Sequence, residues 1–171
     1  MLKTLTVYYL EITDPKDFRT VEKIPPDVRI IRVKEPCPLL NQFFYRNIGR
    51  DWDWIDRRDW SPEQWNAYVS RPQLETWIVH YKGTPAGYIE LDREPEETIQ
   101  IAYLGLLPQF TGKRIGKYVT SFAIQHAFDS GAKRVWLSTC SFDHPAALNT
   151  YLHRGFTIFK TEEIEKEFPE D

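Results

Sequence analysis

A strand that leads directly into a glycine-bearing turn and then into a helix is the segment that most constrains the fold. Residues 98–106 alternate in the manner of a strand, and the turn after them reads LLPQFTGKRIG over residues 106–116. Apolar side chains then recur at the spacing of one helix face, at Ile115, Val119, Phe122 and Ala123. Because a strand passes straight into a helix, the segment predicts a mixed α/β architecture.

The first turn of this helix has the features of an anion-binding site. Unpaired backbone N–H groups and the helix dipole attract negative charge, and Gly112 lets an anion approach the backbone closely. Lys113, Arg114 and Lys117 add positive charge. Six residues separate Gly105 from Gly112 where a Walker A loop has four, and the dinucleotide pattern G-x-G-x-x-G is absent, so both of these phosphate loops are excluded. An ordinary helix start with structural glycines is the alternative interpretation.

The remaining elements predict a single sheet with helices packed on it. Strands are expected at residues 3–12, 28–34, 77–81, 86–92, 135–139 and 156–161, and helices at residues 38–47, 62–70 and 145–154. Short turns join the three strands between residues 77 and 106, which predicts an antiparallel meander.

Side-chain patterns within these elements give more specific expectations. Ser61, with Pro62 and Gln64 after it, predicts a capping box at the start of the second helix. In the first helix the side chains expected to face the core are Leu39, Leu40, Phe43 and Phe44. In the last strand of the meander, alternation predicts that one face carries Ile99, Ile101 and Tyr103.

Length and composition bound the class of protein. With 171 residues the chain is expected to form one domain over residues 1–171, and 42% hydrophobic residues exclude disorder as its main state. The net charge of -3 excludes a nucleic-acid binder driven by bulk charge. Six acids and one base fall within residues 162–171, which are expected to form an acidic, solvated tail. The rest of the chain carries +2 and suits an anionic ligand.

The sequence gives little support for a metal site, a disulfide framework or a membrane span. Cys37 and Cys140 are too few for a disulfide framework or a cysteine-based zinc site, and they favour a cytoplasmic location. No metal-ligand spacing relates the four histidines, His80, His126, His144 and His153. No apolar run approaches the ~20 residues of a membrane span, and the first residues lack a signal-peptide pattern. We therefore expect no metal, nucleic acid or membrane as a partner.

Two motifs in a fixed order resemble those of the GNAT superfamily of acyl-CoA-dependent N-acyltransferases. The family's pyrophosphate loop reads Gln/Arg-x-x-Gly-x-Gly/Ala. Here Gln109, Gly112 and Gly116 match, whereas Arg114 stands where the family usually has Gly or Ala. The family's second pattern, Asn-x-x-Ala-x-x-x-Tyr-x-x-x-Gly-Phe, is matched at Ala147, Tyr151, Gly155 and Phe156, with His144 in place of Asn. Together with the meander, the resemblance covers about residues 76–160.

The resemblance implies a fold and a co-substrate. The fold is an α/β (α+β) domain with one mixed, mostly antiparallel sheet of about seven strands flanked by helices, in which two central strands splay apart to admit acetyl-CoA. The cofactor-binding residues that it implies are Leu104, Leu106, Gln109, Thr111, Gly112, Lys113, Arg114, Gly116, Lys117 and His144. A homodimer is compatible with this fold.

The resemblance also implies direct transfer of an acetyl group from acetyl-CoA to a primary amine of a small molecule or peptide. Such a transfer needs a general base or a water chain to take the proton of the amine, a donor for the oxyanion and an acid for the leaving thiolate. Tyr151 matches the family tyrosine that often serves as the acid, and a backbone N–H near Leu104 is the oxyanion donor. Glu90 and Tyr103 are predicted to act as the base, since apolar neighbours raise the pKa of a carboxyl group. Packing roles for both tyrosines and a solvent-facing Glu90 are the alternatives.

The acceptor site is expected between the two early helices, where tryptophans alternate with acids. Trp52 and Trp54 are predicted to bind a cationic amine through cation–π contacts, with Tyr88 as a third acceptor-binding residue. Arg57 and Arg58 favour instead an anionic or zwitterionic acceptor, or internal pairing with Asp56 and Asp59. Simple packing of the tryptophans is a further interpretation. Two other functions compete with transfer: a non-catalytic acyl-CoA-binding regulatory domain of the same fold, and a structural or interaction module. A Cys140–His144 nucleophile is unnecessary in direct transfer.

Overall fold

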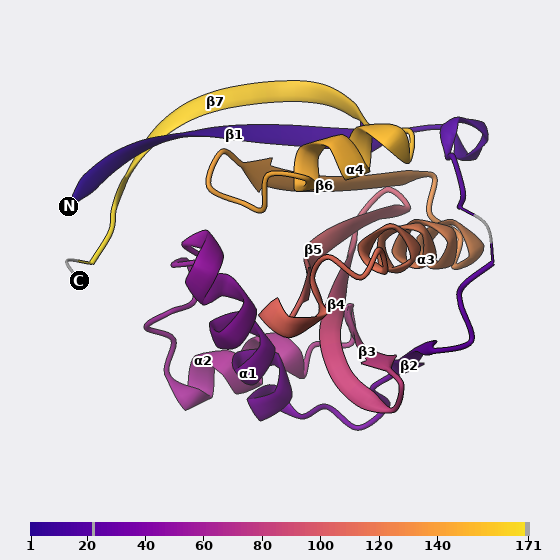
Figure 1. Ribbon diagram of the computed structural model, residues 1–171. Coiled ribbons are helices and arrows are strands. Elements are labelled where there is room, and N and C mark those ends of the chain that lie inside the picture. Colours follow the sequence, from indigo (N-terminus) through magenta and orange to yellow (C-terminus); the bar gives the residue numbers. More distant parts are fainter. Residues whose placement is uncertain (22, 170–171) are drawn as a thin grey trace.

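One seven-stranded sheet organises the molecule in a computed structural model, which describes residues 1–21 and 23–169 (Figure 1). The strand order is β2-β3-β4-β5-β6-β1-β7, and of the neighbouring pairs only β5 and β6 are parallel. The strands are β1 (Leu2–Ile12), β2 (Val28–Arg32), β3 (Leu74–Tyr81), β4 (Thr84–Glu94), β5 (Thr98–Leu106), β6 (Arg134–Cys140) and β7 (Thr157–Glu167). The α-helices are α1 (Pro38–Gly49), α2 (Pro62–Val69), α3 (Gly116–Asp129) and α4 (Ala147–His153). The mixed, mostly antiparallel sheet flanked by helices confirms the predicted fold class.

The sheet carries helices on both faces because its central strands are apolar on both sides. On β4, Ile89 and Leu91 belong to the main core with α3, whereas Tyr88 packs against Phe44 of α1. The stripe predicted for α3 is confirmed, with Val119 fully buried. Figure 1 shows α1 and α2 grouped together, away from α3, with β1 and β7 running across the opposite side of the molecule.

A β-bulge on β5 corrects the predicted alternation of the meander. Glu90 of β4 pairs with Tyr103, but Leu91 pairs with Ile101, so Ala102 has no partner on β4. An extra residue in one strand reverses which face the following side chains occupy. Tyr103 therefore lies on the α1–α2 face, against Tyr45, and does not share the core face of Ile101.

The predicted inward face of α1 is wrong for three of its four residues. Leu39, Leu40 and Phe43 are 73%, 38% and 49% exposed, and only Phe44 is buried. The buried stripe is Asn41, Phe44, Tyr45 and Ile48. It includes a polar residue, because the amide of Asn41 donates hydrogen bonds inside the protein, as described below.

The acidic segment predicted as a solvated tail forms most of the last strand. Residues 162–167 belong to β7 and pair with residues 2–7 of β1. Glu162 accepts a hydrogen bond from the hydroxyl of Tyr9 at 2.8 Å, whereas Glu163 and Glu165 are exposed. Residues 170 and 171 of the predicted tail lie outside the described residues.

Local signals at two turns explain how the helices begin and end. Ser61 and Gln64 form the predicted capping box, with Pro62 in the first turn of α2. Gly155, which ends α4, has φ of +106°, and a Cβ there would overlap the carbonyl oxygen of Asp17. Only glycine fits this position. In the part of the chain that is described, no helix has the length and apolarity needed to cross a membrane.

Candidate active site

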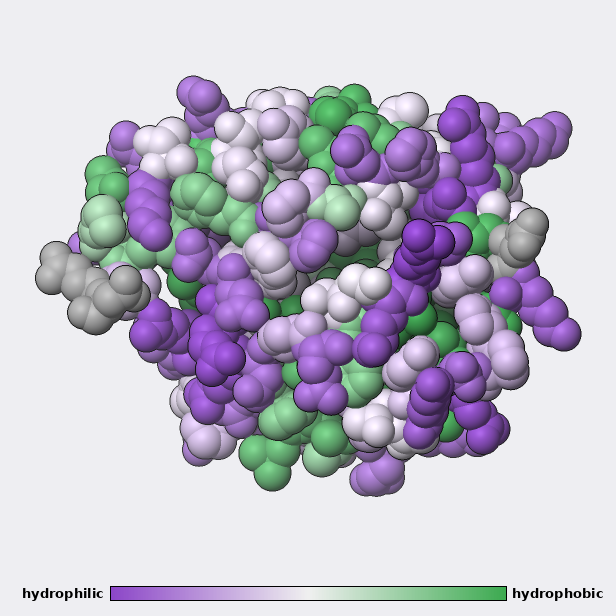
Figure 2. All heavy atoms as spheres, viewed as in Figure 1, coloured by the Kyte–Doolittle hydropathy of each residue, from purple (hydrophilic) through white to green (hydrophobic). Residues whose placement is uncertain are grey.

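The central feature of the site is a gap between β5 and β6. These parallel strands pair only over residues 98–100 and 134–136 and then separate, just before the bulge at Ala102. A cavity of about 660 Å³ lies along the separated ends. Figure 2 shows a recess near the middle of this face, with hydrophobic atoms visible inside a hydrophilic rim. Backbone groups of β5 that face the gap have no ladder partner on β6 and are available to a ligand.

The glycine-bearing turn lies at one end of the cavity. Gly112 and Arg114 both have left-handed backbone conformations, with φ of +77° and +61°. Arg114 thus carries a side chain where glycine would be unstrained. Residues of the turn and of the first turn of α3 line the cavity, among them Thr111, Gly112, Arg114, Gly116 and Lys117.

Two predicted cofactor residues lie away from the cavity. Gln109 and Lys113 are exposed and are not among the residues that line it. The ammonium group of Lys113 lies 5.6 Å from the ring centroid of Tyr81, on the outer side of the turn. Leu104, Leu106 and His144, in contrast, line the cavity as expected.

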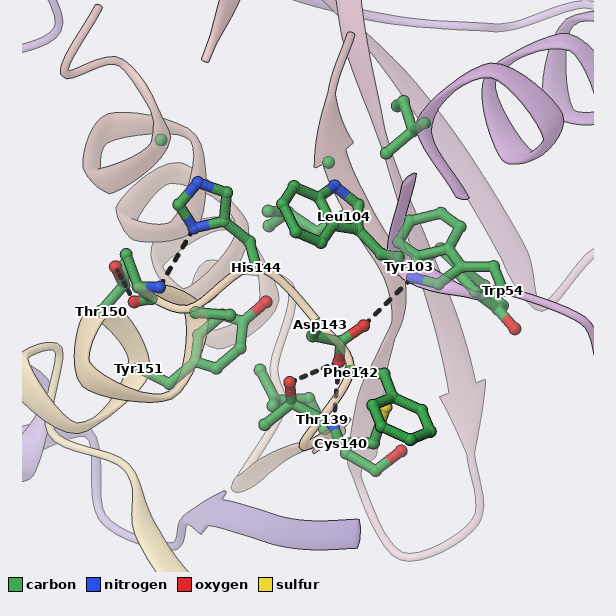
Figure 3. A pocket seen from close by; sticks show the side chains of 18 of the residues that line it. Trp54, Tyr103, Leu104, Thr139, Cys140, Phe142, Asp143, His144, Thr150 and Tyr151 are labelled. Atoms are coloured by element: carbon green, nitrogen blue, oxygen red, sulfur yellow. Dashed lines mark hydrogen bonds between the residues drawn. The ribbon is translucent and has the colours of Figure 1, made fainter. Parts of the chain in front are cut away.

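Tyr151 of α4 lines the middle of the cavity and packs at a 6.0 Å ring distance on Phe156. Burial, with a smaller contribution from the charge of Asp143, raises the pKa of the Tyr151 phenol above its ordinary value. The phenol therefore stays protonated at neutral pH, as a proton donor must. Figure 3 shows the side chains of Tyr151 and Asp143 reaching the same part of the pocket.

Asp143 is the site residue that sequence reasoning missed. One carboxylate oxygen accepts hydrogen bonds from the hydroxyl of Thr139 and, at 2.9 Å, from the backbone N–H of Cys140. The other accepts from the indole N–H of Trp54 at 3.2 Å (Figure 3). These neutral donors fix the carboxylate in the cavity wall, at the end of β6. The available signal was an acid three residues after a strand that buries one face.

Glu90 does not line the cavity, contrary to its predicted role. Its side chain is fully buried, and Nη1 of Arg57 donates to both of its carboxylate oxygens, at 3.0 and 2.9 Å. Asn41 and Tyr68 donate to it as well, at 2.9 and 3.3 Å. Burial is the largest influence on the pKa of Arg57 and acts to lower it, but the Glu90 carboxylate and the neighbouring tyrosine rings together more than offset burial and raise that pKa above its ordinary value. This is a closed ion pair between β4 and the segment that joins α1 to α2.

Arg57 is held by aromatic rings as well as by Glu90. Its guanidinium carbon lies 4.0 Å from the ring centroid of Tyr68 and 4.4 Å from that of Tyr103. Tyr103 lines the cavity on its other side, with its ring 4.8 Å from Trp54. Burial raises the pKa of Tyr103 above its ordinary value, so this phenol stays neutral and cannot accept a proton. The geometry makes Tyr103 a wall of the cavity.

The segment between α1 and α2 forms the other end of the cavity. Trp52, Trp54, Asp53 and Asp56 line it, so the predicted tryptophans are in place. The ring of Trp52 lies 4.9 Å from that of His144, whose Nδ1 accepts from the backbone N–H of Ala146. Tyr88 is fully buried under Phe44 and does not line the cavity. Among the described residues, no group of three or more His, Cys, Asp or Glu side chains has metal-binding geometry.

A mixed sheet whose parallel central pair opens beside a basic helix start defines a class of protein that binds an elongated anionic ligand between its strands. The chain belongs to the Acetyltransferase (GNAT) family, whose sequence model matches residues 37–156. Members of this family of acetyltransferases use acetyl-CoA as co-substrate.

Comparisons with individual proteins agree with this membership. The chain is 29% identical over 90 residues to the uncharacterized N-acetyltransferase YjgM of Escherichia coli K12, a match that covers 51% of this chain and 53% of that protein. The chain thus spans about half the length of this curated relative. A GCN5-related N-acetyltransferase from Sphaerobacter thermophilus has a similar fold, with a TM-score of 0.69, 13% identity, and coverage of 94% of this chain and 50% of that one. The aminoglycoside acetyltransferase meta-AAC0020 from a soil metagenome gives a TM-score of 0.60 at 15% identity, covering 76% and 88% of the two chains.

Proposed function

We propose that this protein is an N-acetyltransferase that transfers the acetyl group of acetyl-CoA directly to a primary amine. The observation that carries the proposal is the gap between β5 and β6, with a basic helix start at one end and Tyr151 beside Asp143 in its wall. The free cysteines Cys37 and Cys140 support a cytoplasmic location.

The residues that line the gap fit the parts of acetyl-CoA. The unpaired backbone of β5 at Leu104 and Leu106 offers hydrogen bonds to the amide groups of its pantetheine arm. The N–H groups before and within the first turn of α3, with Arg114 and Lys117, fit its pyrophosphate. His144 has one ring nitrogen already engaged with Ala146, so it offers a single hydrogen bond where the family usually has the amide of Asn.

The proposed chemistry uses Asp143 and Tyr151. Acetyl-CoA supplies a thioester; the amine nitrogen forms a bond to its carbonyl carbon, and the carbon–sulfur bond breaks. Asp143 takes a proton from the attacking amine, directly or through one water, and Tyr151 gives its phenolic proton to the leaving thiolate. A backbone N–H of β5 near Leu104 stabilises the oxyanion. An ammonium acceptor first loses one proton to solvent and attacks as the neutral amine. The second proton, which Asp143 takes, returns through water to the Tyr151 phenolate and replaces the proton that Tyr151 gave to the thiolate.

In this proposal Glu90 is a positioning residue, whereas its sequence context predicts a catalytic base. Because Arg57 closes off both carboxylate oxygens, Glu90 holds the segment between the first two helices against the sheet. That segment carries Trp54, which in turn donates to Asp143. We therefore propose that Glu90 positions the acceptor wall, and that proton transfer belongs to Asp143.

Release of free thiol from acetyl-CoA in the presence of a panel of amines tests the proposal. We expect turnover with at least one amine, lowered by Tyr151→Phe and by Asp143→Asn but not by Tyr118→Phe, a matched change on α3 outside the cavity. Tight acetyl-CoA binding with no turnover on any amine would instead favour a non-catalytic acyl-CoA-binding domain. Absence of binding in calorimetry would refute both.

A further inference from the structure

The charges that line the cavity are divided between its two ends. Arg114 and Lys117 lie at the α3 end. Among the described residues that line the cavity, the carboxylates are Asp53 and Asp56 at the far end and Asp143 farther in, beside Tyr151. Lys166 of β7 is the one lysine or arginine of the described part of the chain that lines the far end. The α3 end suits an anion, so the far end is left for the acceptor. Its excess of carboxylates favours an acceptor with positive charge.

The outer carboxylates of that end already hold primary ammonium groups from the protein itself. Lys166 forms an ion pair with Asp56, and the ammonium nitrogen of Lys3 lies 3.8 Å from a carboxylate oxygen of Asp53. The Lys3 ammonium also lies 4.8 and 5.8 Å from the ring centroids of Phe168 and Phe142, both of which line the cavity. An ammonium at the end of a flexible alkyl chain therefore fits this rim, between a carboxylate and aromatic rings.

These rim pairs are weak enough to exchange. The side chains of Asp53 and Asp56 are 43% and 60% exposed, and exposed ion pairs contribute about 0–1 kcal/mol. A ligand ammonium can thus replace Lys3 or Lys166 at little cost. The walls between rim and interior are aromatic and apolar, with Trp52, Trp54 and Tyr9 among them, and suit methylene groups better than hydroxyl groups.

The inner carboxylate, Asp143, differs from the two at the rim. It accepts hydrogen bonds from three neutral donors, and among the described residues no lysine, arginine or histidine forms an ion pair with it. Its negative charge inside the cavity is therefore not neutralised by the protein. An amine that enters as a cation supplies the missing charge and meets its base in the same contact.

Building on the function proposed above, we infer that the acceptor is an aliphatic diamine or longer polyamine. One amino group reaches Asp143 and is acetylated, and a second, still protonated, replaces a lysine at Asp53 or Asp56. The intervening methylene chain packs on the aromatic walls. Hydroxyl-rich polycations such as aminoglycosides share the charge but not the apolar body.

Thiol release from acetyl-CoA with matched amines tests this inference. Butylamine and 1,4-diaminobutane have the same carbon chain and differ in one ammonium group. We expect kcat/KM for the diamine to exceed that for butylamine by up to about fivefold, which corresponds to one exposed ion pair of about 1 kcal/mol. In the double variant Asp53→Asn/Asp56→Asn this ratio should fall to about one. Asp51→Asn, an exposed acid of the same segment outside the cavity, should leave the ratio unchanged.

Several outcomes of the same assay would overturn the inference. A kcat/KM for butylamine, phenethylamine, sisomicin or an amino acid that equals or exceeds that for the diamine would overturn it, while the transferase proposal would stand. A diamine preference that survives the double variant would also overturn it. If no amine in the panel releases thiol, the inference fails, and calorimetry with acetyl-CoA then decides separately whether the cavity binds the co-substrate.

Discussion

Replacement of Arg57 by Met tests whether the buried ion pair fixes the acceptor wall. The side chains of Arg57 and Glu90 are 7% and 0% exposed, and one guanidinium nitrogen serves both carboxylate oxygens. Without Arg57, the hydrogen bonds that the described residues still donate to this carboxylate are those of Asn41 and Tyr68. An uncompensated buried charge costs about 3–5 kcal/mol. At about 2–4 °C per kcal/mol for a chain of this length, the midpoint of thermal unfolding should fall by about 6–20 °C.

The double variant Arg57→Met/Glu90→Leu separates the charge from the packing. It removes both charges and keeps apolar volume at both sites, so we expect it to recover most of the lost stability. Asn41 retains its hydrogen bond to Thr76 at 2.9 Å in this variant. Thermal and urea unfolding of the four proteins in the cycle give the coupling free energy. Additive effects, or an Arg57→Met variant as stable as the parent, would refute the assignment of a coupled buried pair.

Three further predictions concern the cavity. Tyr151→Phe should lower kcat about 100-fold with little change in acetyl-CoA affinity. Because burial raises the pKa of this phenol, it stays protonated in the parent protein, and a pH–rate profile should show no fall in kcat as the pH rises to about 10. Asp143→Asn should lower kcat by about 10²–10⁴-fold in the thiol-release assay, whereas an unchanged rate would exclude Asp143 as the base. Arg114→Gly should raise the free energy of unfolding by about 1 kcal/mol, because glycine adopts the φ of +61° at this position without strain. The variant should also bind acetyl-CoA more weakly in calorimetry, because one positive charge is lost. A destabilised variant would contradict the assignment of backbone strain to Arg114.

Much of the fold was predictable because its signals are local. The capping box at Ser61 and the apolar stripe of α3 depend on residues three or four apart, and both are present. The bulge at Ala102 depends on pairing with another strand, and it reversed the predicted side of Tyr103. The strand character of residues 162–167 was hidden for a similar reason. An edge strand with one exposed face tolerates charges there, and only its partner β1 reveals it.

The candidate site was predictable only where motifs mark it. The turn at Gly112 and the tyrosine of α4 follow from spacing along the chain. Arg57 and Asp143 act through contacts with distant residues, Glu90 and Trp54, that no spacing encodes. A buried charge among apolar neighbours does require a partner, so Glu90 on its apolar strand was itself a signal to search for a cation. The same apolar neighbours also favour a raised carboxyl pKa, which is why the sequence alone predicts Glu90 as the base.

The position of bound CoA tests the central claim of this account most directly. A crystal structure of the protein grown with CoA should show the pantetheine arm between β5 and β6 at Leu104 and Leu106. The pyrophosphate should lie against residues 111–117, and the sulfur should lie near the hydroxyl of Tyr151. CoA bound at any other surface, with the gap between β5 and β6 left without it, would contradict the account.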